Sequence, residues 1–392
     1  MINTIVGNPS IIYTFLWCVY HCQGILYPSG SVLSQFCLFA IIIMSLYFTL
    51  RVLIMKYKPE YITALLLMMS IFIIYGVAAY FIDGPTIKGL SDDSSVFNWF
   101  KILFSSILPV FAYYYFSLKK YITAESVKKW LPLFVIITLF VYYHGHHQMI
   151  VKVTKHLGHQ VEEVTNNAGY FVLSLLPLFL LVKNKLIQYT GLFFCAVFIL
   201  FAMKRGAILI GILLLMLMIY RSIKHTTNAK KVLIVLISLI SIIAICIVFS
   251  NMLQTSSYLQ YRIESTIEGK SSGRDDIFST LWNYFLSNPD MLKTLIGNGA
   301  WATTKITWTA AHNDWLEILI DMGIMGVCFY VYYWFIFGKT ILKSQLPSLS
   351  RFGIMLVFLN MFFKTIFSMS FTDMTFFHAI MLGLCLTGRL KD

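Results

Sequence analysis

VLIVLISLISIIAICIVF, residues 232–249, is a run of eighteen residues without a single charge. As an α-helix it is about 27 Å long, close to the roughly 30 Å hydrocarbon thickness of a bilayer. Similar runs recur along the 392-residue chain, of which 58% is apolar and only 12% is charged. Because a soluble core cannot use that much apolar surface, the sequence predicts a polytopic membrane protein.

The apolar runs predict an all-α fold with about twelve transmembrane helices. The predicted spans are 10–27, 33–52, 62–82, 98–117, 130–146, 168–183, 186–203, 206–220, 232–250, 314–338, 352–369 and 372–388. We expect a single membrane-embedded domain with spans within 1–250, one long loop over 251–313 that contains short helices, and further spans within 314–392. No basic N-terminal region with a cleavage site precedes the first span, so we expect no cleavable signal peptide.

Lys and Arg residues set the predicted orientation. If both chain ends are cytoplasmic, most of the 30 Lys and Arg residues lie in cytoplasmic segments and the 251–313 loop lies outside. The net charge of +13 is then concentrated where anionic lipid headgroups attract it, and no nucleic-acid partner is needed to explain it.

Two outside segments carry cations against this rule. Lys204 and Arg205 form a tight turn between two apolar spans, and the 251–313 loop is far longer than the other connections. Long loops in compact bundles are usually functional. These segments are therefore the first candidates for a binding site for a polyanionic ligand.

The loop sequence SSGRDDIFSTLWNYF predicts a helix that begins near Arg274 and has an apolar face. A helix N-terminus and a guanidinium both favour a phosphate group, and this is the favoured interpretation; an ion pair with Asp275 or Asp276, or a contact with a lipid headgroup, is the alternative. Downstream, Gly297 and Gly299 permit a tight turn that would fold the chain back onto the membrane surface.

The loop ends in three polar residues, His312, Asn313 and Asp314, directly before a span. A helix needs only one capping side chain, so Asn313 or Asp314 can start the helix and leave the imidazole for another task. The unperturbed pKa of imidazole lies near neutrality, which suits a group that accepts a proton from an attacking hydroxyl. Two alternatives stay open: His312 caps the helix itself, or it donates a hydrogen bond to a phosphate.

Other polar clusters carry weaker signals. Five histidines between His144 and His159 match no catalytic zinc spacing, so a solvated loop or a ligand contact is favoured over a metal site. The seven cysteines lie in or beside apolar runs and are interpreted as small buried side chains, although Cys18, His21 and Cys22 could share one helical face.

Several of these segments occur in an order that resembles the bacterial O-antigen polymerase and O-antigen ligase superfamily of the inner membrane. They are EVTNNAGYF, KRGAILIG, SSGRDDIF, GNGA and AHNDWLEILIDMGIMG, which together cover roughly residues 160–330. The His-Asn-x-x-x-Glu stretch with its following glycines is the most specific of them. The resemblance implies a GT-C-like, metal-independent glycosyltransferase without a cofactor, whose active site faces the periplasm.

The resemblance also implies roles for individual residues. Arg205 and Arg274 would hold the diphosphate of an undecaprenyl-diphosphate-linked glycan, and His312 would activate the acceptor hydroxyl. Further substrate contacts are assigned to the following residues: Lys204, Arg262, Asn313 and Asn167. Glu317 follows His312 by five residues, which is not a helical contact spacing, so we do not expect it to be the partner of the histidine.

Three functions stay open at this point. A polymerase, which we favour, extends a lipid-linked repeat unit, whereas a ligase transfers the glycan to lipid A-core. Either enzyme would have membrane lipids as partners and would act with a flippase and a chain-length regulator. The third possibility, a lipid-linked oligosaccharide flippase, is disfavoured because intramembrane ionisable residues such as Lys101, Lys364 and His378 are scattered.

Overall fold

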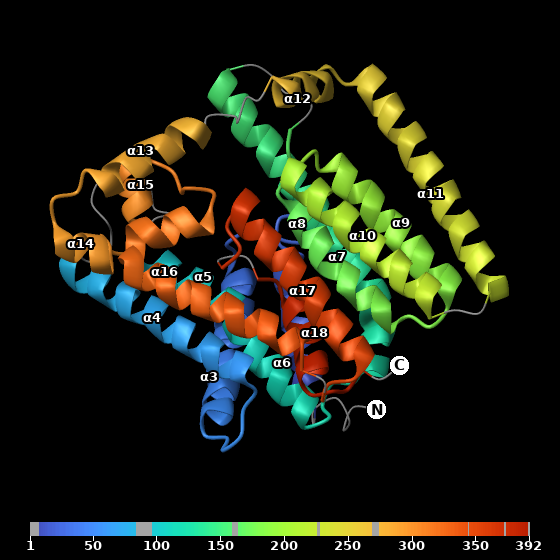
Figure 1. Ribbon diagram of the computed structural model, residues 1–392, viewed down its shortest axis with the longest axis horizontal. Helices are drawn as coiled ribbons and strands as arrows, with labels where there is room; N and C mark the ends of the chain where they lie inside the picture. Colours follow the sequence, from blue (N-terminus) through green and yellow to red (C-terminus); the bar gives the residue numbers. More distant parts are fainter. Residues whose placement is uncertain are drawn as a thin grey trace. The chain divides into compact units, whose positions relative to one another are not determined.

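The computed structural model describes residues 8–83, 96–158, 164–225, 228–268, 274–343, 345–371 and 374–390. Within these ranges the chain forms helices joined by turns and loops, which confirms the predicted all-α class (Figure 1). The helices group into two compact units. The first consists of Met1–Tyr13, Leu38–Tyr121 and Ser271–Asp392, and the second of Thr14–Cys37 and Ile122–Lys270.

Among the described residues, the first unit contains most of α3 and nine further helices. Their bounds are α3 (Val32–Leu53), α4 (Glu60–Asp83), α5 (Val96–Ser106), α6 (Leu108–Leu118), α13 (Arg274–Leu286), α14 (Met291–Ile296), α15 (Ala302–Thr307), α16 (Asp314–Ile341), α17 (Ser348–Phe367) and α18 (Phe376–Leu386).

The second unit contains most of α2 and a group of apolar helices. Their bounds are α2 (Pro9–His21), α7 (Ala124–Leu157), α8 (Ala168–Leu175), the 3-10 helix η2 (Leu176–Leu181), α9 (Lys185–Phe201), α10 (Arg205–Lys224), α11 (Asn228–Thr255) and α12 (Ser257–Ile267).

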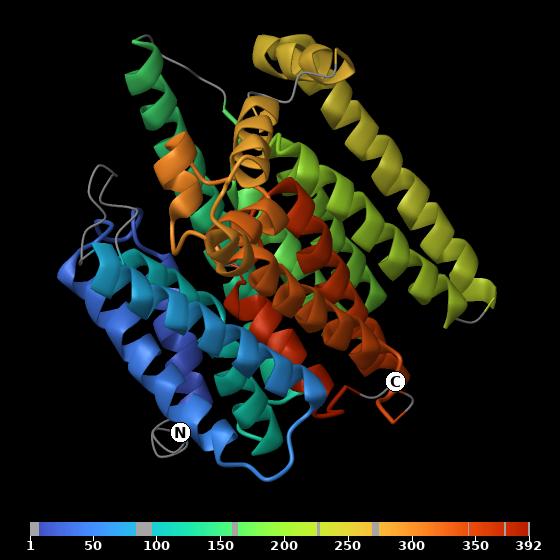
Figure 2. The same cartoon turned by 60° about the vertical axis from the view of Figure 1, so that its left-hand side comes forward.

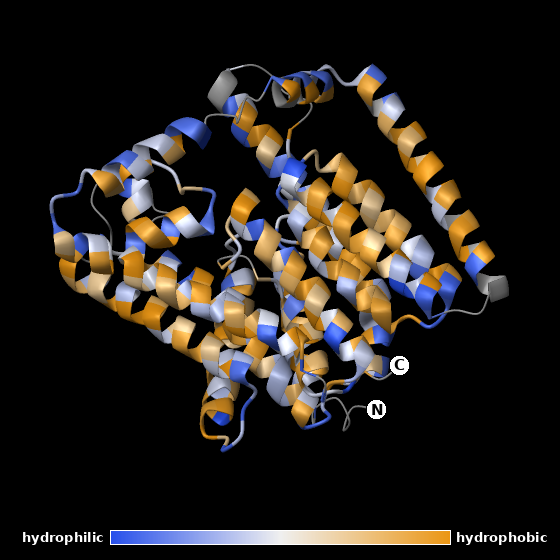
Figure 3. Cartoon of the chain, in the orientation of Figure 1, coloured by the Kyte–Doolittle hydropathy of each residue, from blue (hydrophilic) through white to orange (hydrophobic). Residues whose placement is uncertain are grey.

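Seven helical segments in the described ranges are long and apolar enough to cross a membrane, and three shorter apolar helices accompany them. These segments show as orange ribbons, with bluer connections, in Figure 3. The protein is therefore a multi-pass membrane protein. The predicted total of about twelve spans stays a prediction. One predicted span, 98–117, consists of two helices, α5 and α6, and Pro109 lies in the first turn of α6.

Close packing holds the first unit together. A Cβ atom on Gly383 of α18 would lie 2.6 Å from the carbonyl oxygen of Tyr113, so only glycine permits α18 to approach α6 this closely. In the same unit, α16 packs against both α4 and α17 (Figure 2). The hydroxyl groups of Tyr61 and Tyr333 lie 3.1 Å apart at the contact between α4 and α16.

One end of the α4 and α16 pair is marked by charge. Glu60, the first residue of α4, forms ion pairs with Lys339 at 3.2 Å and Lys343 at 3.6 Å near the end of α16. These side chains are partly exposed, as expected for charges at the edge of a membrane. The pair therefore provides a reference level along both helices.

The other half of α16 contains a kink at Gly323, whose φ of 66° and ψ of −166° are not helical. Next to the kink, two carbonyl groups in the preceding turn of α16 accept hydrogen bonds from another segment of the chain. The Ile320 oxygen accepts from the backbone nitrogen of Asn298 at 3.0 Å, and the Asp321 oxygen accepts from that of Gly299 at 2.9 Å. Gly297 and Gly299 have φ values of 80° and 94°, so the turn predicted at these glycines is confirmed.

We predict that Gly323→Ala destabilises the protein. A Cβ atom there would lie 2.5 Å from the Leu295 carbonyl oxygen, and the backbone conformation is one that L residues rarely adopt. The strain alone amounts to about 1–3 kcal/mol. Gly338→Ala in the same helix is the matched control, because its Cβ would meet only Phe358 side-chain atoms, the nearest at 3.7 Å. Thermal unfolding in detergent should show a lower midpoint for the first variant only, and equal midpoints would contradict the prediction.

Candidate functional site

The start of α16 carries the polar triplet. Asn313 is the N-cap, and its side-chain oxygen accepts from the Leu316 backbone nitrogen at 3.1 Å. This confirms that one member of the triplet caps the helix. His312 precedes the cap with a φ of 54°, in the left-handed region that non-glycine residues seldom enter. Its side chain is half-buried.

Asp314 is fully buried and fastens α16 to the segment after α17. Its carboxylate accepts hydrogen bonds from the backbone nitrogen of Ser370 at 2.8 and 3.0 Å and from that of Phe371 at 3.2 Å. The Tyr330 hydroxyl donates to the same carboxylate at 2.5 Å. A buried carboxylate is tolerated when such donors satisfy it.

Glu317 and Asp321 occupy the same face of α16 and hold the segment before His312. One carboxylate oxygen of Glu317 accepts from the Thr303 hydroxyl at 2.5 Å, and the other from the backbone nitrogen of Ala311 at 2.7 Å. Asp321 accepts from the Thr303 backbone nitrogen at 3.2 Å. Both carboxylates are 1% exposed. Glu317 therefore acts on the backbone next to His312.

The segment 301–312 needs the hydrogen bonds to Glu317 and Asp321 because its backbone is strained. Trp301, Trp308 and His312 all have positive φ values, of 62°, 61° and 54°. Conformations of this kind persist only where surrounding contacts determine them. The two carboxylates accept hydrogen bonds at Thr303 and Ala311, each close to a strained residue.

Arg274 begins α13, as the sequence predicts, and its guanidinium donates from Nη1 to the Phe367 carbonyl oxygen at 2.9 Å. The Asn313 side-chain amide reaches the neighbouring carbonyl of Ile366 at 3.4 Å. Both donors thus meet the C-terminal end of α17. The structure therefore brings the Arg274 and Asn313 side chains to the same end of α17, and His312 directly precedes Asn313 in the chain.

A small apolar cluster fixes α13 in this position. Leu281 is fully buried against Ala302, Ala311 and Ile320, and Ile277 packs on the same cluster. These residues belong to α13, α15, the segment before α16 and α16 itself. The predicted apolar face of α13 therefore orients the helix that begins with Arg274.

A narrow cavity of about 10 Å³, roughly the room of one water molecule, lies beside these anchors. Its walls are Phe72, Trp99, Ile102, Leu103, Trp301, Glu317, Met369 and Phe371. Glu317 is the one carboxylate in this lining.

In the second unit, Lys204 and Arg205 lie at the turn into α10 and are both half-buried. Asn166 holds this turn, because its backbone nitrogen donates to the Ala202 carbonyl at 2.8 Å. Its side chain also donates to the Tyr142 carbonyl at 2.8 Å and accepts from the Ala168 nitrogen at 2.9 Å. Asn167, the residue assigned to substrate from the sequence, is exposed beside it.

The remaining predicted residues give less information. Arg262 lies in α12, and its side chain is outside the described residues, as is His159 of the histidine group. His144 contacts the Ser29 hydroxyl through Nε2 at 3.2 Å, within the second unit. In the ranges that the structure describes, no three His, Cys, Asp or Glu side chains are grouped so as to hold a metal ion.

Sequence reasoning missed the buried acceptors Asp314, Glu317 and Asp321. Their signal is present in the sequence, because three carboxylates at positions i, i+3 and i+7 share one face of an otherwise apolar helix. Charged groups on such a helix must find partners. The sequence could not show that these partners are backbone nitrogens of two other segments.

Residues 190–331 match the family model described as O-antigen ligase. The match runs from α9 into α16 and includes Arg205, Arg262, Arg274, His312 and Asn313, whereas Asn167 lies before it. It confirms the resemblance to the O-antigen polymerase and ligase superfamily and does not separate the two activities. A search of curated proteins gave no match.

We predict that Glu317→Ala destabilises the protein and Glu317→Gln does not. Alanine leaves the Ala311 nitrogen and the Thr303 hydroxyl without their acceptor, which amounts to about 1–3 kcal/mol for each buried group. Glutamine can still accept from Ala311, while its amide donates to the hydroxyl oxygen of Thr303. Thermal unfolding of both variants checks this, and an alanine variant as stable as the parent would contradict the assigned anchor.

Proposed function

We propose that this protein, whose residues 190–331 match the family model described as O-antigen ligase, polymerises lipid-linked oligosaccharide repeat units. The donor is a glycan on undecaprenyl diphosphate, and the acceptor is the terminal sugar of a second lipid-linked unit. The product is O-antigen or a related surface polysaccharide. Transfer takes place at the periplasmic face of the bacterial inner membrane.

The observation that supports the proposal is the meeting of the Arg274 and Asn313 side chains at the end of α17, with His312 as the residue directly before Asn313. One guanidinium nitrogen donates to Phe367, and the fork geometry of the group leaves further N–H donors for a second acceptor. A diphosphate offers such acceptors. The nearby imidazole is the type of group that removes a proton from a hydroxyl near neutral pH.

In the proposed reaction the acceptor hydroxyl oxygen attacks the anomeric carbon of the donor. The new glycosidic bond forms as the bond between this carbon and the diphosphate oxygen breaks, and the electron pair leaves with the diphosphate. His312 takes the hydroxyl proton, and Arg274 stabilises the negative charge that develops on the leaving group. The proposal requires no cofactor.

The other assigned residues support binding. Arg205 and Lys204 at the start of α10 contribute cations for phosphate, and Asn313 places an amide beside His312. Asn167 and Arg262 are proposed as further substrate contacts. Because Asn166 fixes the backbone of the turn at Ala202, it keeps Lys204 and Arg205 in position.

The positive charge of the segments expected on the periplasmic face favours polymerisation over ligation. A polymerase must accommodate two undecaprenyl diphosphates at once. The segments expected on the periplasmic face are rich in cations, which are Lys204, Arg205, Arg262, Lys270, Arg274, Lys293 and Lys305. Phosphorylated lipid A-core is also anionic, so ligase activity is the alternative outcome that a deletion strain would reveal.

We predict that Arg274→Lys and His312→Asn each abolish most glycan transfer. A lysine cannot reproduce a two-pronged phosphate contact, and loss of a charge-assisted hydrogen bond worth about 1.5–3 kcal/mol corresponds to roughly 10- to 100-fold in rate. Asparagine tolerates the left-handed backbone at residue 312 but cannot act as a base, so a loss of about 100-fold or more is expected.

The assay is polymer formation in a complemented deletion strain, with protein amounts measured in the membrane. Lys128→Gln is the charge control, because this partly exposed lysine pairs with Glu125 in the first turn of α7 and is not among the cations assigned to the substrate. It should retain activity. Near-normal polymer with His312→Asn would remove the assignment of the general base.

The phenotype of a deletion strain shows which acceptor the protein uses. If the protein is the polymerase, the ligase still works, and lipopolysaccharide should carry a single repeat unit on each core. Gel analysis of lipopolysaccharide together with extracted lipid-linked glycans measures both products. Bare cores with long glycans accumulating on the lipid carrier would identify the protein as the ligase instead.

A further inference from the structure

The short helix α14 lies at an unexpected level in the first unit. It belongs to the loop that the sequence places outside the membrane, yet it packs on α16 at the kink rather than at the helix start. Leu295 and Gly297 approach Gly323 so closely that a Cβ on this glycine would lie 2.5 Å from their backbone atoms. Figure 1 shows α14 beside α4 and α16.

The charged end of α16 gives the depth of this contact. Gly323 precedes Lys339 by sixteen residues, and a helix of that length spans about 24 Å. Lys339 pairs with Glu60 at the level taken as one membrane edge. Since the hydrocarbon layer is about 30 Å thick, α14 meets α16 several ångströms inside its opposite edge.

Helix α4 gives the same depth independently. The Tyr75 hydroxyl donates to the carbonyl oxygen of Ile296, the last residue of α14, and also approaches the Met322 carbonyl at 3.2 Å. Tyr75 follows Glu60 by fifteen residues, or about 23 Å of helix. Beyond Tyr75, Phe81 and Ile82 are each 80% exposed, which continues the apolar surface past the level of α14.

The side chains of α14 are of the type expected at this depth in the membrane. Met291, Leu292, Leu295 and Ile296 are 81%, 62%, 45% and 41% exposed, although all four are large and apolar. Lys293 is the one charged residue of the helix, and a lysine can extend its ammonium group toward the membrane surface. It lies 3.9 Å from Asp290, the N-cap.

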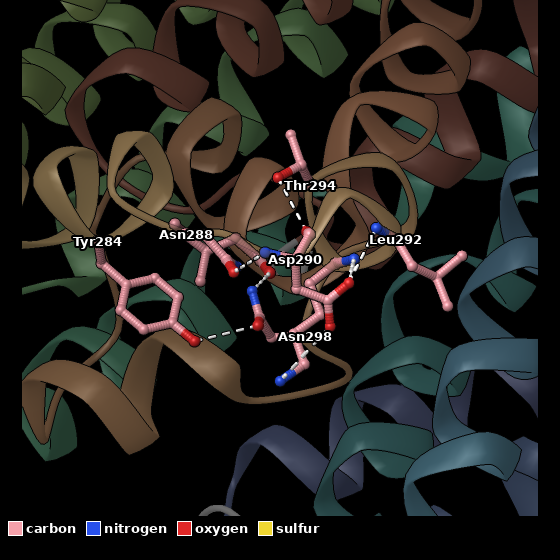
Figure 4. A network of polar contacts seen from close by, with 8 residues as sticks. Tyr284, Asn288, Asp290, Leu292, Thr294 and Asn298 are labelled. Carbon is pink, nitrogen blue, oxygen red and sulfur yellow. Dashed lines mark hydrogen bonds and ion pairs between the residues drawn. The ribbon is translucent and has the colours of Figure 1, made fainter.

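The backbone that enters and leaves α14 is also satisfied, which is a requirement for irregular chain at membrane depth. Asp290 accepts from the nitrogens of Leu292 and Lys293, and the Tyr284 hydroxyl donates to the Asn298 side chain at 3.0 Å (Figure 4). The Asn298 amide nitrogen donates to the Ile320 carbonyl at 3.1 Å. The α16 kink thus supplies acceptors for the turn after α14.

We propose that α14 is a re-entrant helix whose Met291, Leu292, Leu295 and Ile296 side chains lie among the acyl chains of the leaflet opposite Glu60. The occupant of this apolar face is lipid. The proposal does not depend on the reaction that the protein performs, because it rests on the depth of α14 along two spanning helices.

Fluorescence quenching in reconstituted vesicles tests the depth. A Cys246→Ser and Cys328→Ser background removes the exposed native cysteines. Leu295→Cys and Leu292→Cys are then labelled one at a time with a small fluorophore. We expect strong quenching by phospholipids that carry a nitroxide near the glycerol and weak quenching by iodide in the water.

Two controls calibrate the measurement. Cys328, kept as the native residue in a variant that carries Cys246→Ser alone, is exposed on α16 about 7 Å further toward Lys339 than Gly323, so its label should respond best to a nitroxide deep in the acyl chain. Ser279→Cys on exposed α13 should respond to iodide. The proposal is overturned if both α14 labels behave like Ser279, or if they are shielded from lipid and iodide alike, which would indicate a protein partner.

Discussion

Buried carboxylates on the first turns of α16 are the constraint on which the rest of the first unit depends. Asp314, Glu317 and Asp321 accept hydrogen bonds from backbone nitrogens of two separate segments, 301–311 and 370–371. Because the acceptors are polar and almost fully buried, losing a donor would leave an unsatisfied buried group, which is energetically costly. The same helix thereby fixes the backbone before His312 and the turn after α17.

This constraint explains how an unusual local conformation is maintained where chemistry is proposed. His312 lies between Ala311, which is held by Glu317, and Asn313, which caps α16. Arg274 and Asn313 both reach the end of α17, three and four residues before the segment held by Asp314. If α14 lies at the edge of the acyl chains, this arrangement sits just beyond the hydrocarbon layer, at the level of lipid phosphates.

Much of the fold could be predicted because membrane-spanning helices can be recognised from their long runs of apolar residues. The helix at Arg274, the turn at Gly297 and the cap at Asn313 follow from local rules and agree with the structure. The kink at Gly323 did not follow, since a lone glycine in an apolar run has no distinct signal. Nor could the sequence show that Asn166 rather than Asn167 carries the hydrogen bonds of its loop, because adjacent identical residues differ only by tertiary contacts.

The most direct test of the account is transfer by the purified protein in vesicles that contain only a lipid-linked repeat unit and a chelator. The account predicts that products with two and more repeats appear together with one undecaprenyl diphosphate released for each bond formed. Arg274→Lys should reduce both products in parallel. Redistribution of intact donor between the leaflets without diphosphate release would contradict the account, because it would identify a transporter rather than a glycosyltransferase.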